Sequence, residues 1–192
     1  MYEVRIHGRG GQGAVTAAEL LSVAAFDAGS TAQAFPSFGS ERAGAPVVAF
    51  CRIDDRPIRL REPVVTPDAV IILDPTLLHA VDVFQGLKPG GVVLINSAHP
   101  VADLGLTELT DEGRAGVVCV SATEIALRHF GRPLPNGVML GGFAALTGVV
   151  PIADIERALR DRFAGPIGEK NAAAAREAFD SVQISHQEAA GV

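Results

Sequence analysis

Three glycines near the start of the chain have the spacing of a phosphate-binding loop. Gly8, Gly10 and Gly13 form the pattern Gly-x-Gly-x-x-Gly between an expected strand and an expected helix. Glycine lets the backbone approach a phosphate closely, and the first turn of the following helix offers N–H groups with no partner inside the helix. We therefore predict an anion-binding loop made of Gly8, Arg9, Gly10, Gly11, Gln12 and Gly13. The alternative is a tight strand-to-helix turn that binds no ligand.

The loop lacks the residue that usually selects NAD. A NAD site has an Asp or Glu about 20 residues further on, where it accepts hydrogen bonds from the ribose hydroxyls. Residues 30–35 read Ser-Thr-Ala-Gln-Ala-Phe and contain no acid, so Gln33 is the only residue there with an amide for a sugar. The pattern indicates a Rossmann-like loop without its NAD-selective partner.

Other polar residues are expected at the same edge of the sheet as the glycine loop. Parallel strands joined by right-handed crossovers place all their carboxyl ends at one edge. That edge should hold the glycine loop, the loop over 36–46, the run 74–76 and the run 96–97. We add Ser40, Glu41, Arg42 and Asn96 to the candidate binding residues. Alternatively, Glu41 and Arg42 form a surface ion pair with each other, and Asp74 serves a helix N-terminus.

No arrangement of catalytic or metal-binding residues is visible. The five histidines are scattered, and no Ser–His–Asp arrangement can be recognised. The two cysteines, Cys51 and Cys119, form no CxxC motif, so this chain alone should hold neither an iron–sulfur cluster nor a structural zinc. We assign no catalytic residue and no metal ligand to this chain.

The composition narrows the class of protein. The 192 residues are 48% hydrophobic and 20% charged, which is typical of a globular domain. The net charge of −6, with no basic block, argues against a nucleic-acid partner. No uncharged apolar run reaches the roughly 18 residues that a membrane span needs, and the N-terminus does not resemble a secretory signal. We expect a cytoplasmic protein with no membrane partner.

Strand-like and helix-like segments alternate along the chain, which predicts an α/β fold. We expect a Rossmann-like, mostly parallel sheet with helices on both faces, one antiparallel hairpin and a helical C-terminal region. The expected strands are 2–7, 31–35, 47–53, 57–61, 69–73, 92–95 and 117–120, with the hairpin formed by 47–53 and 57–61 around Asp54 and Asp55. The expected helices are 14–28, 76–86, 121–130, 137–147, 151–163 and 169–182, with Ser121 and Glu124 as a capping box. Residues 1–184 should form a single domain, followed by a frayed tail over 185–192.

Several motifs together resemble one family. The run His7 to Gly13, the run Glu41 to Pro46, the run Asp74 to Thr76, the run Asn136 to Gly142 and the run Glu169 to Asn171 occur in that family's order and spacing. The chain resembles the gamma subunit of 2-oxoacid:ferredoxin oxidoreductases from about residue 2 to 180, with the pyruvate enzymes as the nearest likeness.

The resemblance implies a subunit of a larger enzyme. That enzyme oxidatively decarboxylates a 2-oxoacid with thiamine diphosphate and Mg²⁺, passes electrons through [4Fe–4S] clusters and forms an acyl-CoA. The alpha, beta and delta partner subunits would hold most of these cofactors, and ferredoxin or a NAD-reducing subunit would accept the electrons. This sequence lacks the Gly-Asp-Gly…Asn-Asn pattern of thiamine diphosphate binding. Its glycine loop would face coenzyme A or a partner subunit.

Three functions remain open at this point. The first is a gamma subunit with no complete active site of its own, which we expect to be inactive alone. The second is a stand-alone nucleotide-binding oxidoreductase domain, and the third is a structural subunit whose loop binds nothing. A related complex that uses an aromatic or branched-chain 2-oxoacid is a variant of the first.

Overall fold

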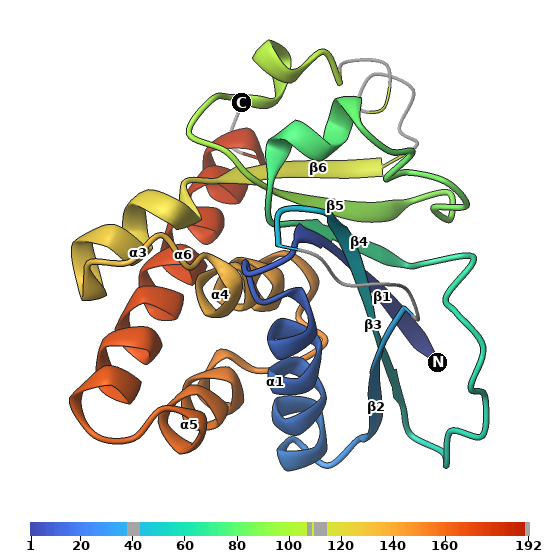
Figure 1. Ribbon diagram of the computed structural model, residues 1–192, viewed down its shortest axis with the longest axis horizontal. Coiled ribbons are helices and arrows are strands. Elements are labelled where there is room, and N and C mark those ends of the chain that lie inside the picture. Colours follow the sequence, from blue (N-terminus) through green and yellow to red (C-terminus); the bar gives the residue numbers. More distant parts are fainter. Residues whose placement is uncertain (38–42, 107–108, 110–114, 191–192) are drawn as a thin grey trace.

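A six-stranded mixed sheet forms the centre of the molecule in the computed structural model (Figure 1). The structure describes the chain except residues 38–42, 107–108, 110–114 and 191–192, and describes only the backbone of 185–190. The spatial order of the strands is β2-β3-β1-β4-β5-β6. Their bounds are β1 Tyr2–Arg9, β2 Thr31–Pro36, β3 Pro46–Asp54, β4 Ala69–Ile72, β5 Gly91–Asn96 and β6 Ala115–Val120.

The predicted α/β class and the mostly parallel sheet are confirmed. Strands β1, β4, β5 and β6 pair in parallel, whereas β3 runs antiparallel to both β1 and β2. The antiparallel hairpin is therefore β2–β3, and the prediction that residues 57–61 pair with β3 was wrong. Both edges of β3 are already occupied by β1 and β2, and Pro57 has no N–H to donate to a ladder.

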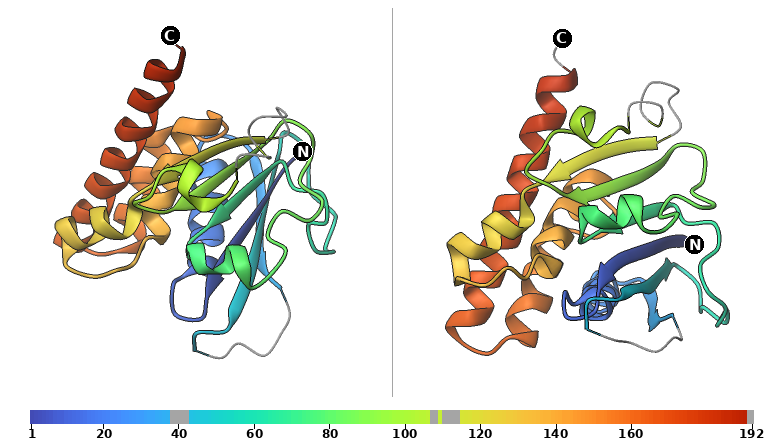
Figure 2. Two further views of the ribbon diagram at one scale, coloured as in Figure 1. Left: turned by 90° about the horizontal axis from the view of Figure 1, so that it is seen from above. Right: turned by 45° about the horizontal axis from the view of Figure 1, so that its top comes forward.

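The long α-helices of the described residues cover one face of the sheet, as Figure 1 shows for α1, α4 and α6. Their bounds are α1 Ala14–Asp27, α3 Ala122–Phe130, α4 Asn136–Thr147, α5 Ile152–Arg162 and α6 Pro166–Ala190. Helix α6 packs across α3, α4 and α5, and its C-terminal end extends away from the sheet (Figure 2). It continues to Ala190, past the predicted start of the tail at residue 185.

The second face is covered by short 3-10 helices, η1 Pro75–His79 and η2 Val101–Leu104, and by the irregular segments around them. The α-helix expected over 76–86 is reduced to η1. The reason lies in the sheet, because the buried guanidinium of Arg5 donates to the carbonyl oxygens of Val83 and Gln85 at 3.0 and 2.6 Å. This contact holds residues 83–85 in an irregular course, in which the N–H of Val83 donates to the carbonyl oxygen of Val81, and the β-branched Val81 and Val83 favour a helix only weakly.

Small residues let α6 cross α4 at very short range. An added Cβ on Gly141 would lie 1.9 Å from the carbonyl oxygen of Ala175, so no larger residue fits at that position. Ala172, Ala174, Ala175 and Ala178 of α6 are completely buried. This close crossing fixes the N-terminal ends of α4 and α6 relative to the sheet, and both ends contribute to the site described next.

Candidate functional site

The glycine loop connects the carboxyl end of β1 to the start of α1, as predicted. Strand β1 ends at Arg9, and Gly13 is the N-cap residue of α1. Gly11 and Gly13 have φ values of 97° and 80°, which favour glycine strongly. A Cβ on Gly13 would also lie 2.5 Å from Nδ2 of Asn136, whereas a Cβ on Gly11 would meet no atom within 4 Å. Gly13 is therefore the point where the start of α1 meets the start of α4.

A network of polar side chains holds the loop against the end of β4. The amide of Gln12 accepts a hydrogen bond from the Arg9 N–H at 2.7 Å and donates one to Asp74 at 2.7 Å. The Arg9 guanidinium donates to Oγ1 of Thr76 and to the carbonyl oxygen of Gly44, and lies 3.3 Å from the Asp74 carboxylate. Asp74 also accepts from the backbone N–H of Thr76, as the N-cap of η1. Arg9 and Gln12, both predicted to bind ligand, thus brace the loop.

The charge on Asp74 is stabilised by this network. Partial burial raises the pKa of its carboxyl, but the hydrogen bonds from Thr76 and Gln12 and the nearby charge of Arg9 outweigh that effect. The pKa therefore lies below its ordinary value, and Asp74 is ionised at neutral pH. The Arg9 charge is largely compensated inside the protein.

The loops that were expected to share this edge do meet there. The N–H of Gly10 donates to the carbonyl oxygen of Ala45, and the N–H of Gly44 donates to the carbonyl oxygen of Gly10. Thr76 and Asp74 join from the end of β4, so three predicted segments are in contact. Ser40, Glu41 and Arg42 lie outside the residues that the structure describes.

Asn96, the last predicted binding residue, is buried and engaged by the fold. Its Nδ2 donates to the carbonyl oxygen of Leu73 and to Oγ1 of Thr123, both at 2.8 Å, and its Oδ1 accepts from the N–H of Thr123. Asn96 therefore caps helix α3 from the neighbouring strand. The predicted Ser121–Glu124 capping box was wrong, because the Ser121 side chain makes no capping hydrogen bond.

His7, next to the loop, is buried in the sheet, where it contacts the side chain of Arg5. Its Nε2 accepts a hydrogen bond from Nε of Arg5 at 3.1 Å. Burial, together with the charge of Arg5, lowers the pKa of His7 to about 4. The imidazole is therefore neutral at pH 7 and does not supply a positive charge to the loop.

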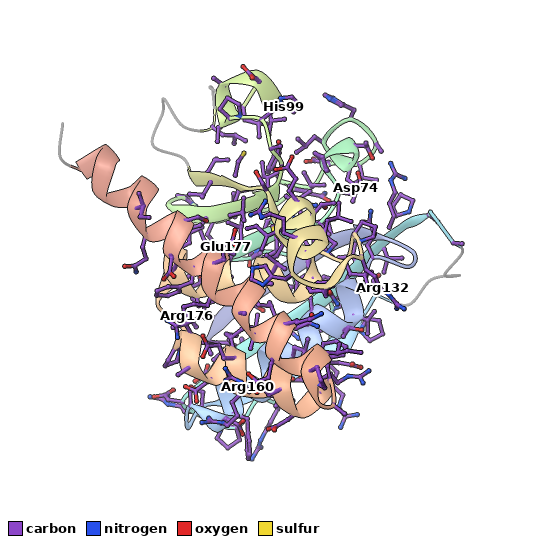
Figure 3. The ribbon with its side chains drawn as sticks, turned by 90° about the vertical axis from the view of Figure 1, so that its left-hand side faces the viewer. Asp74, His99, Arg132, Arg160, Arg176 and Glu177 are labelled. Carbon is purple, nitrogen blue, oxygen red and sulfur yellow. The ribbon has the colours of Figure 1, made fainter. Side chains whose placement is uncertain are left out.

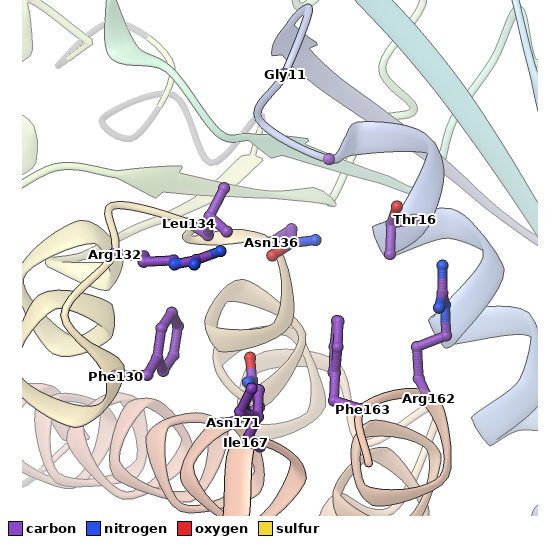
Figure 4. Close-up of a pocket in the computed structure, with 11 residues that line it drawn as sticks. Gly11, Thr16, Phe130, Arg132, Leu134, Asn136, Arg162, Phe163, Ile167 and Asn171 are labelled. Atoms are coloured by element: carbon purple, nitrogen blue, oxygen red, sulfur yellow. Dashed lines mark hydrogen bonds between the residues drawn. The ribbon is translucent and has the colours of Figure 1, made fainter.

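Two hollows flank the glycine loop. The smaller one, about 210 Å³, lies beside Arg9, Gly10, Val15 and Val47. The larger one, about 570 Å³, lies between the loop, the α3–α4 connection and the start of α6 (Figure 4). Its walls include Asn136 and Asn171, which stand in two of the motifs that carried the family resemblance. The runs 136–142 and 169–171 therefore pointed to functional residues in the sequence, but the sequence alone could not show that the two runs meet at one cavity.

Ion pairs fix the helices that form one wall of the larger cavity. Arg160 of α5 lies 2.9 Å from Glu169 of α6, and Arg176 of α6 lies 2.6 Å from Glu156 of α5. Glu177 pairs with Arg128 and His129 of α3, and Figure 3 shows Arg160, Arg176 and Glu177 along this helical layer. The α5–α6 turn is thereby held in place on both sides.

The residues present do not fit an iron–sulfur cluster. Cys51 is completely buried in β3, Cys119 is half-buried in β6, and burial raises the pKa of their thiols to about 12 and 11. In the described part of the chain, no three His, Cys, Asp or Glu residues gather as metal ligands. Within the same residues, no helix is long and apolar enough to span a membrane.

The sheet order places β1 and β4 side by side with parallel carboxyl ends. The chain leaves β1 toward the α-helical face and leaves β4 toward the other face. This divergence is the position at which open α/β sheets bind ligands. The molecule is thus a Rossmann-like α/β domain with a braced glycine loop at that position. On its other side β1 pairs with antiparallel β3, where a NAD site has a parallel second strand that carries the ribose-binding acid. The acid at the end of β4, Asp74, is already bound by Gln12, Thr76 and Arg9.

Known proteins match this chain over nearly its full length. Residues 3–181 match the family model described as pyruvate ferredoxin/flavodoxin oxidoreductase. The chain is 50% identical to the pyruvate/ketoisovalerate oxidoreductases common subunit gamma of Thermococcus litoralis, over 96% of this chain and 98% of that one. It is 52% identical to pyruvate synthase subunit PorC of Methanothermobacter marburgensis, over 96% and 99%. The crystal structure of pyruvate oxidoreductase subunit PORC from Thermotoga maritima superposes with a TM-score of 0.78 at 36% identity, covering 93% and 95%. The chain belongs to the pyruvate ferredoxin/flavodoxin oxidoreductase family.

Proposed function

We propose that this chain is the gamma subunit of a cytoplasmic 2-oxoacid:acceptor oxidoreductase that converts pyruvate and coenzyme A to acetyl-CoA. The observation that carries the proposal is the full-length match, at about 50% identity, to proteins named as gamma or PorC subunits. The described residues contain no cluster of metal ligands, and the two cysteines are too few for the four thiolates of a [4Fe–4S] cluster. Thiamine diphosphate, Mg²⁺ and the clusters then reside on the alpha, beta and delta subunits.

Within that complex, the braced edge of the sheet would receive a phosphate of coenzyme A. The small hollow beside Arg9 is lined by Gly10, Gly11, Gly13 and the first residues of α1, and the first turn of α1 contains no acid. Uncompensated N–H groups at a helix N-terminus favour an anion. The alternative role for this edge is contact with a partner subunit, which the assembled enzyme can distinguish.

The test is Arg9→Ala in the reconstituted complex, with Arg56→Ala as the control. Arg56 is a well-exposed arginine whose removal changes the net charge equally. If the edge receives coenzyme A, Arg9→Ala removes the side chain that braces the glycine loop, so it raises the KM for coenzyme A about tenfold and leaves the KM for pyruvate unchanged. A loss of the subunit from the complex on a sizing column, with normal coenzyme A kinetics, indicates the assembly role. Unchanged kinetics and unchanged assembly would reject both roles for Arg9.

A further inference from the structure

We infer that the 570 Å³ cavity between α1, α4 and α6 is a second binding site, for a small organic oxyanion that carries a flat apolar body. The oxyanion would be a phosphate or a carboxylate. This inference does not rest on the proposed function, because it concerns a different cavity and uses this chain alone.

The first observation is an unpartnered polar side chain aimed into the cavity. Asn136 is only 8% exposed and lines the cavity, yet its side-chain amide has no hydrogen-bond partner among the residues that the structure describes. Asn171 is 7% exposed and lines the same cavity; its Nδ2 donates to the carbonyl oxygen of Ile167 at 2.8 Å, and its Oδ1 has no hydrogen-bond partner among the described residues. Buried amides are almost always hydrogen-bonded, so these groups are suited to a polar ligand.

The second observation is uncompensated positive charge. Helix α4 begins at Asn136 with Pro135 as its N-cap, so it has no side-chain cap and no acid in its first turn. Arg132 and Arg162 line the same cavity, and neither forms an ion pair with any carboxylate in the described part of the chain. No Asp or Glu is among the lining residues. In a protein with a net charge of −6, this concentration of positive charge favours an anion.

The third observation concerns the walls. The rings of Phe130 and Phe163 stand on either side of Asn171 and Ile167, as Figure 4 shows. The guanidinium of Arg162 lies over the Phe163 ring at 5.7 Å. Two aromatic walls with amides between them suit a planar group, while the arginines and the start of α4 suit its oxyanion. A bare inorganic ion would leave the aromatic walls unused.

Isothermal titration of the full chain at low ionic strength tests the inference with two probes. ADP offers a phosphate with a planar base, and phenylpyruvate offers a carboxylate with a planar ring. We expect saturable binding of at least one probe, and the probe that binds identifies the oxyanion as phosphate or carboxylate. Arg132→Ala and Arg162→Ala should each raise its dissociation constant about tenfold, because each removes one charge-assisted contact. Arg56→Ala, the exposed control, should leave it unchanged.

Asn136→Asp is a more specific variant, because it keeps the shape of the side chain but places a negative charge in the cavity, which should repel an anionic ligand. An acid in the first turn favours helix α4, so the variant should melt at or above the wild-type temperature while binding of the probe is lost. Failure of both probes to bind the wild-type chain at millimolar concentration would overturn the inference. Binding that survives the cavity variants and disappears in Arg9→Ala would also overturn it, and would leave the proposed function standing.

Discussion

Replacement of Gly13 by alanine tests how the glycine loop and helix α4 are joined. The substitution meets two separate costs: a φ of 80°, which an L side chain rarely adopts, and a Cβ placed 2.5 Å from Nδ2 of Asn136. Gly11→Ala is a matched control, because Gly11 has a φ of 97° but open space where the Cβ would lie. The difference between the two variants isolates the contact between α1 and α4.

The magnitudes follow from these two costs. Left-handed backbone strain costs about 1–2 kcal/mol for an L residue, and both variants carry it. Overpacking against a fixed neighbour adds about 1–3 kcal/mol, and only Gly13→Ala carries that part. We therefore expect Gly13→Ala to lower the free energy of unfolding by about 2–5 kcal/mol and Gly11→Ala by about 1–2 kcal/mol. Urea titration followed by circular dichroism measures both values.

A double-mutant cycle then assigns the extra cost to Asn136. In an Asn136→Ala background the clashing amide is absent, so Gly13→Ala should cost no more than Gly11→Ala does in the wild type. If Gly13→Ala is no more destabilising than Gly11→Ala, or if its cost is the same in both backgrounds, then Gly13 is not the junction between the two helices.

Three further predictions concern single residues and ligands. Asn96→Ala should lower the free energy of unfolding by about 2–3 kcal/mol in urea titration, because it removes the cap of α3 and a buried hydrogen bond. Ser121→Ala should change that free energy by less than about 0.5 kcal/mol, since its side chain makes no capping hydrogen bond. Equal effects of the two variants would contradict the capping role of Asn96. The pKa of about 4 for His7 means that the unfolded chain binds more protons than the folded chain between pH 6.5 and 4, so stability falls as pH falls through that range. His7→Gln should remove about 3 kcal/mol of that fall, seen as a flatter profile of unfolding free energy against pH, and an unchanged profile would show that His7 is not responsible. Calorimetry should detect no binding of NAD(H) at micromolar concentration, because antiparallel β3 stands where the acid-bearing second strand of a NAD site would lie, and Asp74 at the end of β4 is engaged by Gln12, Thr76 and Arg9. Stoichiometric binding would favour the stand-alone oxidoreductase.

Much of the fold could be predicted because the local patterns are strong. The buried runs of β4, β5 and β6 read as parallel strands, and the glycine loop with its Ala-rich helix was correct in type and position. The errors share a cause, which is tertiary competition for backbone groups. Residues 57–61 alternate like a strand, but β3 has no free edge for them. Residues 80–86 resemble the end of a helix, but Arg5, which is distant in the sequence, holds residues 83 and 85 in an irregular course through their carbonyl oxygens.

Only part of the candidate site could be predicted, because the position of a loop follows from the direction of its strand but the role of a side chain does not. The sharing of one sheet edge by the loops follows from the direction of parallel strands, and it holds for Arg9, Gly44 and Thr76. The role of each side chain depends on partners that are distant in sequence. Asn96 faces Thr123, and Gln12 faces Asp74, so both residues brace the fold where chemistry alone suggested a ligand. Asn136 belongs to a motif that the sequence showed, but its contact with Gly13 depends on how α4 packs against α1.

Co-purification with the partner subunits, followed by turnover, tests the central claim most directly. The complex should contain this chain in fixed stoichiometry on native mass measurement and should reduce a dye when given pyruvate and coenzyme A, ahead of branched-chain, aromatic and 2-oxoglutarate substrates. The purified chain alone should reduce none, because its two cysteines are too few for the four thiolates of a [4Fe–4S] cluster. Pyruvate-dependent dye reduction by the pure chain, or full activity of a complex that lacks it, would contradict the assignment as a gamma subunit.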